Sequence, residues 1–276
     1  MEPSPNPSKT VPSASFTRLA RDSGFEFALT AVLLFGVVSI VRWVIGPSPI
    51  SRAIPQIHIE LVIVGATVGL LLAGLILSPP GRASGGHTNP AISLAMWRFG
   101  VFPGAGVLPY AVAQLLGSVV GVVGAREVWG PVVAARSVEY AALQPGPGWS
   151  TWELFVGEAL GMAAIIFIVG VCLAVHRLAP FVPWIVGALV GTGIAALGTA
   201  TGGSLNPARQ FGPAVLSRVT LHLWVYLLAP MLGAELAVWF RQAIQSRRAV
   251  LTHRLCGTLD SYHTRTPKHT DYELVP

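Results

Sequence analysis

Six apolar stretches, each about as long as a bilayer is thick, constrain the fold of this chain more than any other feature. A helix needs about 20 mostly apolar residues to cross the hydrocarbon core of a membrane. The stretches cover residues 25–45, 59–78, 105–125, 154–175, 181–201 and 221–240. The composition agrees, because 53% of the 276 residues are hydrophobic and only 11% are charged, whereas soluble domains carry about 25% charged residues. We therefore predict an all-α membrane protein with six transmembrane helices.

The positions of Lys and Arg predict how these helices are oriented, since basic residues mark the cytoplasmic side. With the N-terminus inside, twelve of the 18 basic residues fall in cytoplasmic segments. The other six are Arg42, Arg52, Arg126, Arg136, Arg209 and Arg218. This distribution predicts a multi-pass plasma-membrane protein with both termini in the cytoplasm. Residues 1–24 lack the short basic start of a signal peptide, so we expect the first span to remain in the mature protein.

Several other classes of function find no support in the sequence. The net charge of +6 comes from scattered Lys and Arg residues without a recognition motif, so we expect no nucleic-acid partner. The only cysteines, Cys172 and Cys256, form neither a disulfide framework nor a metal-ligand spacing. No nucleophile and base are found at a recognisable spacing, which argues against an enzyme and against a metal or cofactor.

The chain divides into two halves that repeat the same features in the same order. Each half opens with a span that has one acidic residue near its start, Glu26 or Glu158, and continues with a span carrying a Gly-xxx-Gly pair. Each then has a Gly-rich turn with Asn-Pro-Ala, read as SGGHTNPA at 84–91 and TGGSLNPA at 201–208. Because a half holds three spans, the second half enters the membrane from the opposite face, and the repeats are inverted. The glycine pairs also fit ordinary close packing of helices in lipid.

These halves give the expected domain boundaries. We expect a cytoplasmic N-terminal segment over 1–24 and a channel domain over 25–242, with repeats at about 25–129 and 152–242. Residues 243–276 are polar and charged without sustained apolar periodicity, and we expect them to form a flexible cytoplasmic tail.

The Asn-Pro-Ala triplets predict two helices that begin inside the membrane. Asn is a strong N-cap and Pro is preferred at the first helical position. The helices that follow, 91–99 and 208–217, are too short to cross the bilayer, so we interpret them as re-entrant half-helices beside a polar pathway. Their positive ends would meet at the midplane and disfavour cations, while the Asn amides offer donors to a passing solute. One triplet alone could be a helix cap in a surface loop. The triplets are Asn89, Pro90 and Ala91, and Asn206, Pro207 and Ala208.

Four further polar residues each allow two interpretations. Arg209 lies about one helical turn after Asn206, where an arginine at membrane depth is costly, so we favour a fixed charge at an outer constriction over a snorkelling side chain. Glu26 and Glu158 could relay protons, but their matched positions favour bracing of the Gly-rich turns through hydrogen bonds. His87 could titrate, but without a second histidine nearby in the sequence a structural hydrogen bond is favoured.

Together these features resemble the major intrinsic protein family, the aquaporins and aquaglyceroporins, over about 25–242. The resemblance rests on SGGHTNPA, GGSLNPARQFGP, Glu26, Glu158 and the six-span duplication. It implies the aquaporin fold, a passive channel with one pore per subunit, and usually a homotetramer in the membrane.

In that family an outer aromatic/arginine filter of four residues selects the solute. By this resemblance, the four filter positions are occupied here by Val68, Ile194, Gly203 and Arg209, with Gly69 as the alternative to Val68. Water-selective members typically have a large aromatic residue and a histidine at the first two places, so small aliphatic residues imply a wider and less polar opening.

Two further positions help to indicate which subgroup of the family the chain resembles. Tyr226 and Leu227 before Pro230 resemble the plant nodulin-like subgroup and its bacterial relatives, which include carriers of glycerol, boric acid and arsenite-like hydroxides. Gln210 is neither the Ser common in water channels nor the Asp common in glycerol facilitators, which leaves the solute open. The leading hypothesis is a channel for small neutral solutes and water that excludes ions and protons. The alternatives are a water-selective aquaporin and a coupled secondary transporter.

Overall fold

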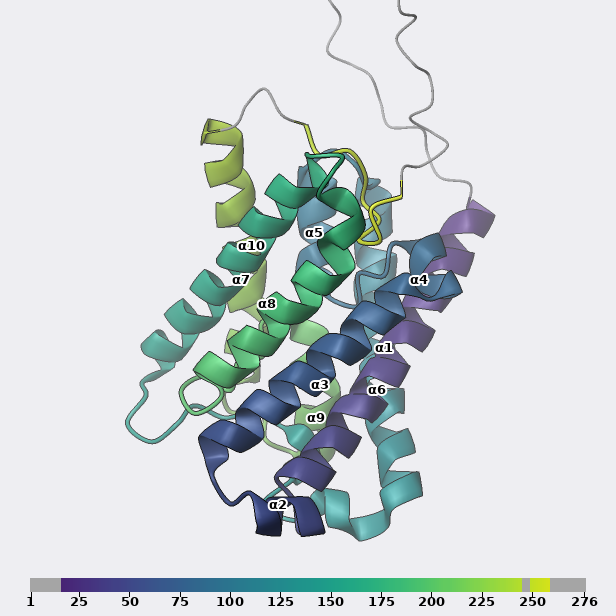
Figure 1. The fold of residues 1–276 in the computed structure, drawn as a ribbon. Coiled ribbons are helices and arrows are strands. Elements are labelled where there is room, and N and C mark those ends of the chain that lie inside the picture. Colours follow the sequence, from purple (N-terminus) through teal and green to yellow (C-terminus); the bar gives the residue numbers. More distant parts are fainter. Residues whose placement is uncertain (1–15, 245–248, 259–276) are drawn as a thin grey trace, which may run out of the picture.

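The computed structural model describes residues 16–244 and 249–258 of the chain. Six of its helices are long and apolar enough to cross a membrane, and they pack as one tilted bundle (Figure 1). This arrangement confirms the predicted all-α fold class. The six are α1 (Phe16–Val44), α3 (Ile57–Leu77), α6 (Gly104–Trp129), α7 (Thr151–Leu173), α8 (Val182–Leu197) and α10 (Leu223–Ile244).

Shorter helices connect the six. The two half-helices are α5 (Pro90–Arg98) and α9 (Pro207–Ser217), and each begins at the proline of its triplet. The others are α2 (Pro49–Ala53), α4 (Pro79–Ser84), and the 3-10 turns η1 (Gly130–Ala134), η2 (Glu139–Ala141) and η3 (Ala179–Phe181). Both α2 and α4 follow a serine N-cap, Ser48 or Ser78, whose hydroxyl accepts backbone hydrogen bonds of the first turn.

The start of α1 and the end of α8 are among the helix ends that differ from those that hydropathy predicts. Helix α1 begins at Phe16 rather than at 25, because its polar first turns continue the helix and Leu19 packs against the core. Helix α8 ends at Leu197 rather than at 201. The amides of Ala200, Thr201 and Gly202 all donate to the carbonyl of Leu197, which turns the chain into the second Gly-rich loop.

Glycines set three close helix crossings. Where α3 crosses α8, Gly65 faces Gly191 and Gly69 faces Gly187, so that a Cβ on any of them would run into the backbone of its partner. Helix α6 meets α1 in the same way through Gly117 and Gly121, and α10 meets α7 through Gly233. Each pairing of the first repeat thus has its counterpart in the second, and the α3–α8 crossing joins the repeats. This matches the inverted duplication expected from the sequence.

Part of the tail is packed against the bundle rather than extended away from it. Within 249–258, Val250, Leu255 and Cys256 are buried and belong to the main hydrophobic cluster. The segment lies at the end of the bundle where α1 begins and α10 ends (Figure 1), which we call the terminal face. The expectation of a flexible tail from 243 onward is therefore corrected for 249–258. The remaining tail, 245–248 and 259–276, and residues 1–15 of the N-terminal segment lie outside the described residues.

Candidate functional site

The two half-helices meet at the centre of the bundle through their asparagines. Asn89 caps α5, its Oδ1 accepting from the Ala91 amide at 2.9 Å. Asn206 caps α9, its Oδ1 accepting from the Ala208 amide at 2.9 Å. One amide N–H of each side chain crosses to the other repeat. Asn89 Nδ2 donates to the Leu205 carbonyl and Asn206 Nδ2 to the Thr88 carbonyl, each at 3.0 Å. Since an amide nitrogen carries two hydrogens, each asparagine keeps a second donor.

The loops that lead into the asparagines have the same unusual backbone. Thr88 and Leu205, each directly before its asparagine, adopt φ of 46° and 51°. Residues other than glycine rarely adopt this left-handed region, and it costs about 1–3 kcal/mol where it is held in place. In this conformation the carbonyl of each of these two residues accepts a hydrogen bond from the asparagine of the other repeat.

Glu26 holds the first loop from α1. The side chain is fully buried, and its carboxylate accepts from the Ser84 hydroxyl at 2.7 Å, the His87 amide at 3.0 Å and the Thr88 amide at 2.7 Å. Gln114 Nε2 of α6 adds a fourth bond at 2.8 Å. These bonds satisfy donors of irregular backbone that would otherwise be buried without a partner.

Glu158 holds the second loop from α7 in the same way. It is also fully buried, and it accepts from the Thr201 hydroxyl at 2.7 Å, the Ser204 amide at 3.1 Å and the Leu205 amide at 2.6 Å. All of its partners lie in the loop before α9, as those of a bracing carboxylate would.

Two buried tyrosines complete the loops, and sequence reasoning did not assign them this contact. Tyr110 of α6 donates its hydroxyl hydrogen to the Ser84 carbonyl at 2.8 Å, and Tyr226 of α10 donates to the Thr201 carbonyl at 2.6 Å. Their nearly equal distances after Asn89 and Asn206 in the sequence were the available signal.

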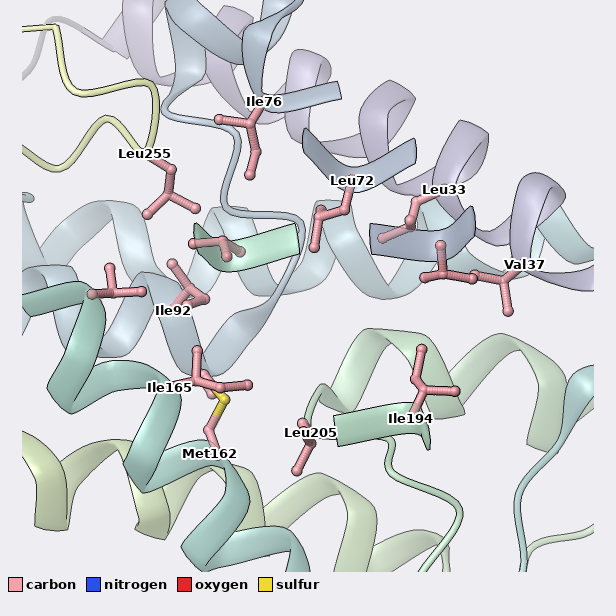
Figure 2. Packing of buried hydrophobic residues seen from close by; sticks show 14 of the residues in the cluster. Leu33, Val37, Leu72, Ile76, Ile92, Met162, Ile165, Ile194, Leu205 and Leu255 are labelled. Atoms are coloured by element: carbon pink, nitrogen blue, oxygen red, sulfur yellow. The ribbon is translucent and has the colours of Figure 1, made fainter. Parts of the chain in front are cut away.

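A cavity between the two repeats runs past both asparagines. The four residues expected to form the filter, Val68, Ile194, Gly203 and Arg209, all line it. Its remaining wall is mostly aliphatic, and Figure 2 shows Leu33, Val37, Met162, Ile165 and Leu205 among the side chains gathered there.

The structure also distinguishes between Val68 and Gly69. Val68 is buried and lines the cavity. Gly69 instead faces Gly187 at the α3–α8 crossing, where a Cβ would meet the Gly187 backbone. Of these two, Val68 is therefore the one whose side chain borders the cavity, as Val64 and Leu72 of α3 also do.

Arg209 is held to the loop between α6 and α7. Its Nη1 donates to the Ala141 carbonyl at 2.7 Å. That carbonyl follows an unusual run in which Glu139, Tyr140 and Ala141 all have positive φ. Gln210 is buried and holds the same loop, accepting from the Leu143 amide at 3.0 Å and donating to the Leu143 carbonyl at 2.9 Å. The sequence marked Gln210 only as a departure from the family pattern.

His87 has a neighbour that its position in the sequence does not suggest. Its Nε2 lies 3.0 Å from the His253 carbonyl and its Nδ1 lies 3.0 Å from the Ser93 hydroxyl. Because a carbonyl only accepts, Nε2 carries a hydrogen, and in the neutral ring Nδ1 accepts from Ser93. The rings of His87 and His253 are 5.9 Å apart, so a second histidine lies nearby in space although none does in the sequence.

Two inverted repeats, each with a half-helix whose capping asparagine borders a shared cavity, define a membrane channel. The comparison with known families agrees. Residues 13–241 match the family described as major intrinsic protein, and the chain belongs to this family, that of the aquaporins and aquaglyceroporins.

Similar proteins include ones from an archaeon and a plant. The chain is 37% identical over 183 residues to the probable aquaporin AqpM of Archaeoglobus fulgidus, covering 64% of this chain and 73% of that protein. It is 32% identical over 234 residues to aquaporin NIP3-1 of Oryza sativa, covering 83% and 70%. The fold is similar to the X-ray structure of the aquaglyceroporin from Plasmodium falciparum, with a TM-score of 0.67 and 22% identity over 82% of this chain and 96% of that one.

Proposed function

We propose that this protein is a passive channel for small uncharged solutes, namely glycerol, urea, boric acid or similar metalloid hydroxides, and for water. The observation that supports this range of solutes is the composition of the wall around Arg209. Val68 and Ile194 offer only aliphatic surface, and Gly203 has no side chain to narrow the opening. A carbon-bearing solute can contact such a wall while Arg209 and the asparagines replace hydrogen bonds that it made with water.

Exclusion of ions and protons follows from the meeting of α5 and α9. The N-terminus of each half-helix carries a partial positive charge of about half an elementary charge, and it points at the centre of the cavity. Both asparagines donate there and their oxygens are used in capping. At the asparagines a cation would meet hydrogen-bond donors in place of the acceptors of its hydration shell, whereas a neutral solute can use these donors.

Stopped-flow light scattering on proteoliposomes tests the solute range. We expect glycerol, urea or boric acid to enter at rates well above those of empty vesicles. Replacing Val68 with Phe and Ile194 with His should lower glycerol entry and retain water entry, because the two larger side chains narrow the opening. Glycerol flux that the double variant leaves unchanged would mean that these residues do not form the filter.

Two other functions are outcomes of the same measurements. A rise in water permeability alone would identify a water-selective aquaporin. Uptake that depends on a proton or sodium gradient would identify a coupled secondary transporter. The described residues lining the cavity include Arg209 and His87 as the ionisable groups, which offers little for coupling to an ion gradient.

We further propose a homotetramer in the plasma membrane with both termini in the cytoplasm. The excess of basic residues in the segments on the terminal face supports the orientation. Many apolar side chains of the helices are exposed on the single chain, among them Val62, Leu70 and Trp184, and lipid or neighbouring subunits would cover them. Native mass spectrometry of the purified protein tests the oligomer, and protease access in oriented vesicles tests the topology.

A further inference from the structure

Residues 249–258 lie at the terminal face of the bundle, outside the repeats that build the channel. Their backbone bonds to both repeats. The Leu251 amide donates to the Leu173 carbonyl at the end of α7 at 3.2 Å, and the Leu255 amide donates to the Gly85 carbonyl of the first Gly-rich loop at 3.0 Å. The His253 carbonyl accepts from His87 Nε2 of that loop. The segment is thus anchored around the opening of the cavity on that face.

The segment has a defined local shape. The Thr252 hydroxyl donates to the Thr258 carbonyl at 2.9 Å, and the Gly257 amide donates to the Arg254 carbonyl at 2.9 Å. Gly257 has φ of +76°, and a Cβ there would run into the carbonyl of Ala179. Only glycine combines this backbone with this close approach, so the docked segment depends on Gly257.

Leu255 reaches from this segment into the conduction pathway. Its side chain is 1% exposed and lines the same cavity as Asn89 and Arg209. Figure 2 shows it at one end of the cluster, near Ile76 and Ile92. A polar solute that leaves water at this point meets an aliphatic side chain that offers it no hydrogen bond, which raises the barrier to entry.

We propose that residues 249–258 are a plug that closes the terminal mouth of the pore, with Leu255 as its constricting residue. The channel conducts when the segment leaves its site, so the undocked fraction scales the flux of every solute. This inference rests on the proposed channel function. It predicts that weakening the docking raises flux without altering the filter at Val68, Ile194 and Arg209.

Two full-length variants test the plug in proteoliposomes. Gly257→Ala should undock the segment, and Leu255→Ala should remove the constriction while leaving the backbone anchors. Because a minor conformation is commonly populated at about 10% or less, full release should raise water and solute flux by at least about tenfold. The control for Gly257→Ala is Gly74→Ala, because a Cβ at Gly74 would meet nothing within 4 Å. The control for Leu255→Ala is Leu228→Ala, because the Leu228 side chain is 57% exposed. Both should conduct like the wild type.

Labelling of Cys256 reports docking independently of flux. Cys256 is 6% exposed in the docked segment, and Cys172→Ser makes it the only cysteine. In that background a thiol reagent should react slowly with the parent protein and much faster with Gly257→Ala. Fast labelling of the parent, or fast labelling of Gly257→Ala without a gain in any flux, overturns the plug. A gain in water flux with glycerol excluded from all variants supports the plug and contradicts the proposed solute range.

Discussion

At the scale of single residues, the two fully buried carboxylates, Glu26 and Glu158, leave little room for substitution. Glu158→Gln places an amide donor where only donors face it, because Thr201, Ser204 and Leu205 all donate to this carboxylate. Leaving one of these groups unpaired costs about 1–3 kcal/mol. We expect a lower melting temperature in detergent and reduced solute flux, measured by thermal unfolding and stopped flow.

Glu153→Gln is the matched control on the same helix. Glu153 accepts from the Ser150 amide and hydroxyl in a capping box at the start of α7. Gln serves at this position of a capping box as well as Glu does, so the variant should unfold like the wild type. An equal loss in the two variants would contradict a bracing role specific to Glu158.

Gln210 offers a second prediction, on selectivity. Gln210→Ala removes both side-chain bonds to the Leu143 backbone and loosens the loop whose Ala141 carbonyl holds Arg209. A less restrained Arg209 samples positions across the opening, which obstructs a large solute more than water. We expect glycerol permeability to fall about twofold relative to water permeability, which corresponds to about 0.4 kcal/mol on the barrier.

The control for this substitution is Gln242→Ala. Gln242 Nε2 donates to the Arg98 carbonyl at an exposed position on α10, so the same change of side chain occurs away from the filter. If the ratio of glycerol to water permeability stays at its wild-type value in Gln210→Ala, Gln210 does not position Arg209.

At the scale of elements, the α3–α8 crossing determines how the repeats fit together. Gly65→Ala drives a methyl group into the carbonyl of Gly191, and overpacking of this kind typically costs about 1–3 kcal/mol. We expect a lower melting temperature in detergent. Gly74→Ala changes the same helix where space is open, so it should melt like the wild type, and a shared loss would show that helix propensity rather than the crossing is responsible.

The elements that the sequence predicts are those defined by local chemistry. Apolar length locates the six spans, and Asn followed by Pro locates the starts of α5 and α9, because capping involves only adjacent residues. The short helix α4 was missed, although Ser78 and Pro79 carry a similar signal over fewer turns. The residues of η2 could not be found from sequence, since positive φ at Glu139, Tyr140 and Ala141 goes against their local preference.

Contacts between distant segments account for the rest of what the sequence left open. The packing of Leu255 depends on Gly85, which lies far away along the chain, and the polar composition of the tail gives no sign of it. The same reasoning applies to His87, whose partner His253 lies 166 positions later. The role of Glu26 was accessible only because Glu158 occupies the same place in the second repeat, so duplication supplied the information that a single half lacks.

At the scale of the whole molecule, the two repeats are joined at the centre by reciprocal bonds between the asparagines and the carbonyls before them. Asn89 Nδ2 reaches Leu205 and Asn206 Nδ2 reaches Thr88. Each loop carries the donor of one of these bonds and the acceptor of the other. Loss of one bond therefore also weakens the other. We therefore expect Asn89→Ala and Asn206→Ala to be coupled, with an interaction free energy of about 0.5–3 kcal/mol in a double-mutant cycle of unfolding.

A second cycle provides the reference for this coupling. Asn89→Ala combined with Glu153→Gln pairs a central residue with one at the start of α7, whose carboxylate accepts from the Ser150 amide and hydroxyl. Independent sites add within about 0.5 kcal/mol, so this cycle should close. If the asparagine pair is equally additive, the two half-helices are positioned separately by Glu26 and Glu158, and the crossed bonds only report that they are close. Coupling above that level means that the midplane barrier is a joint property of both repeats, because neither half-helix then keeps its position without the other.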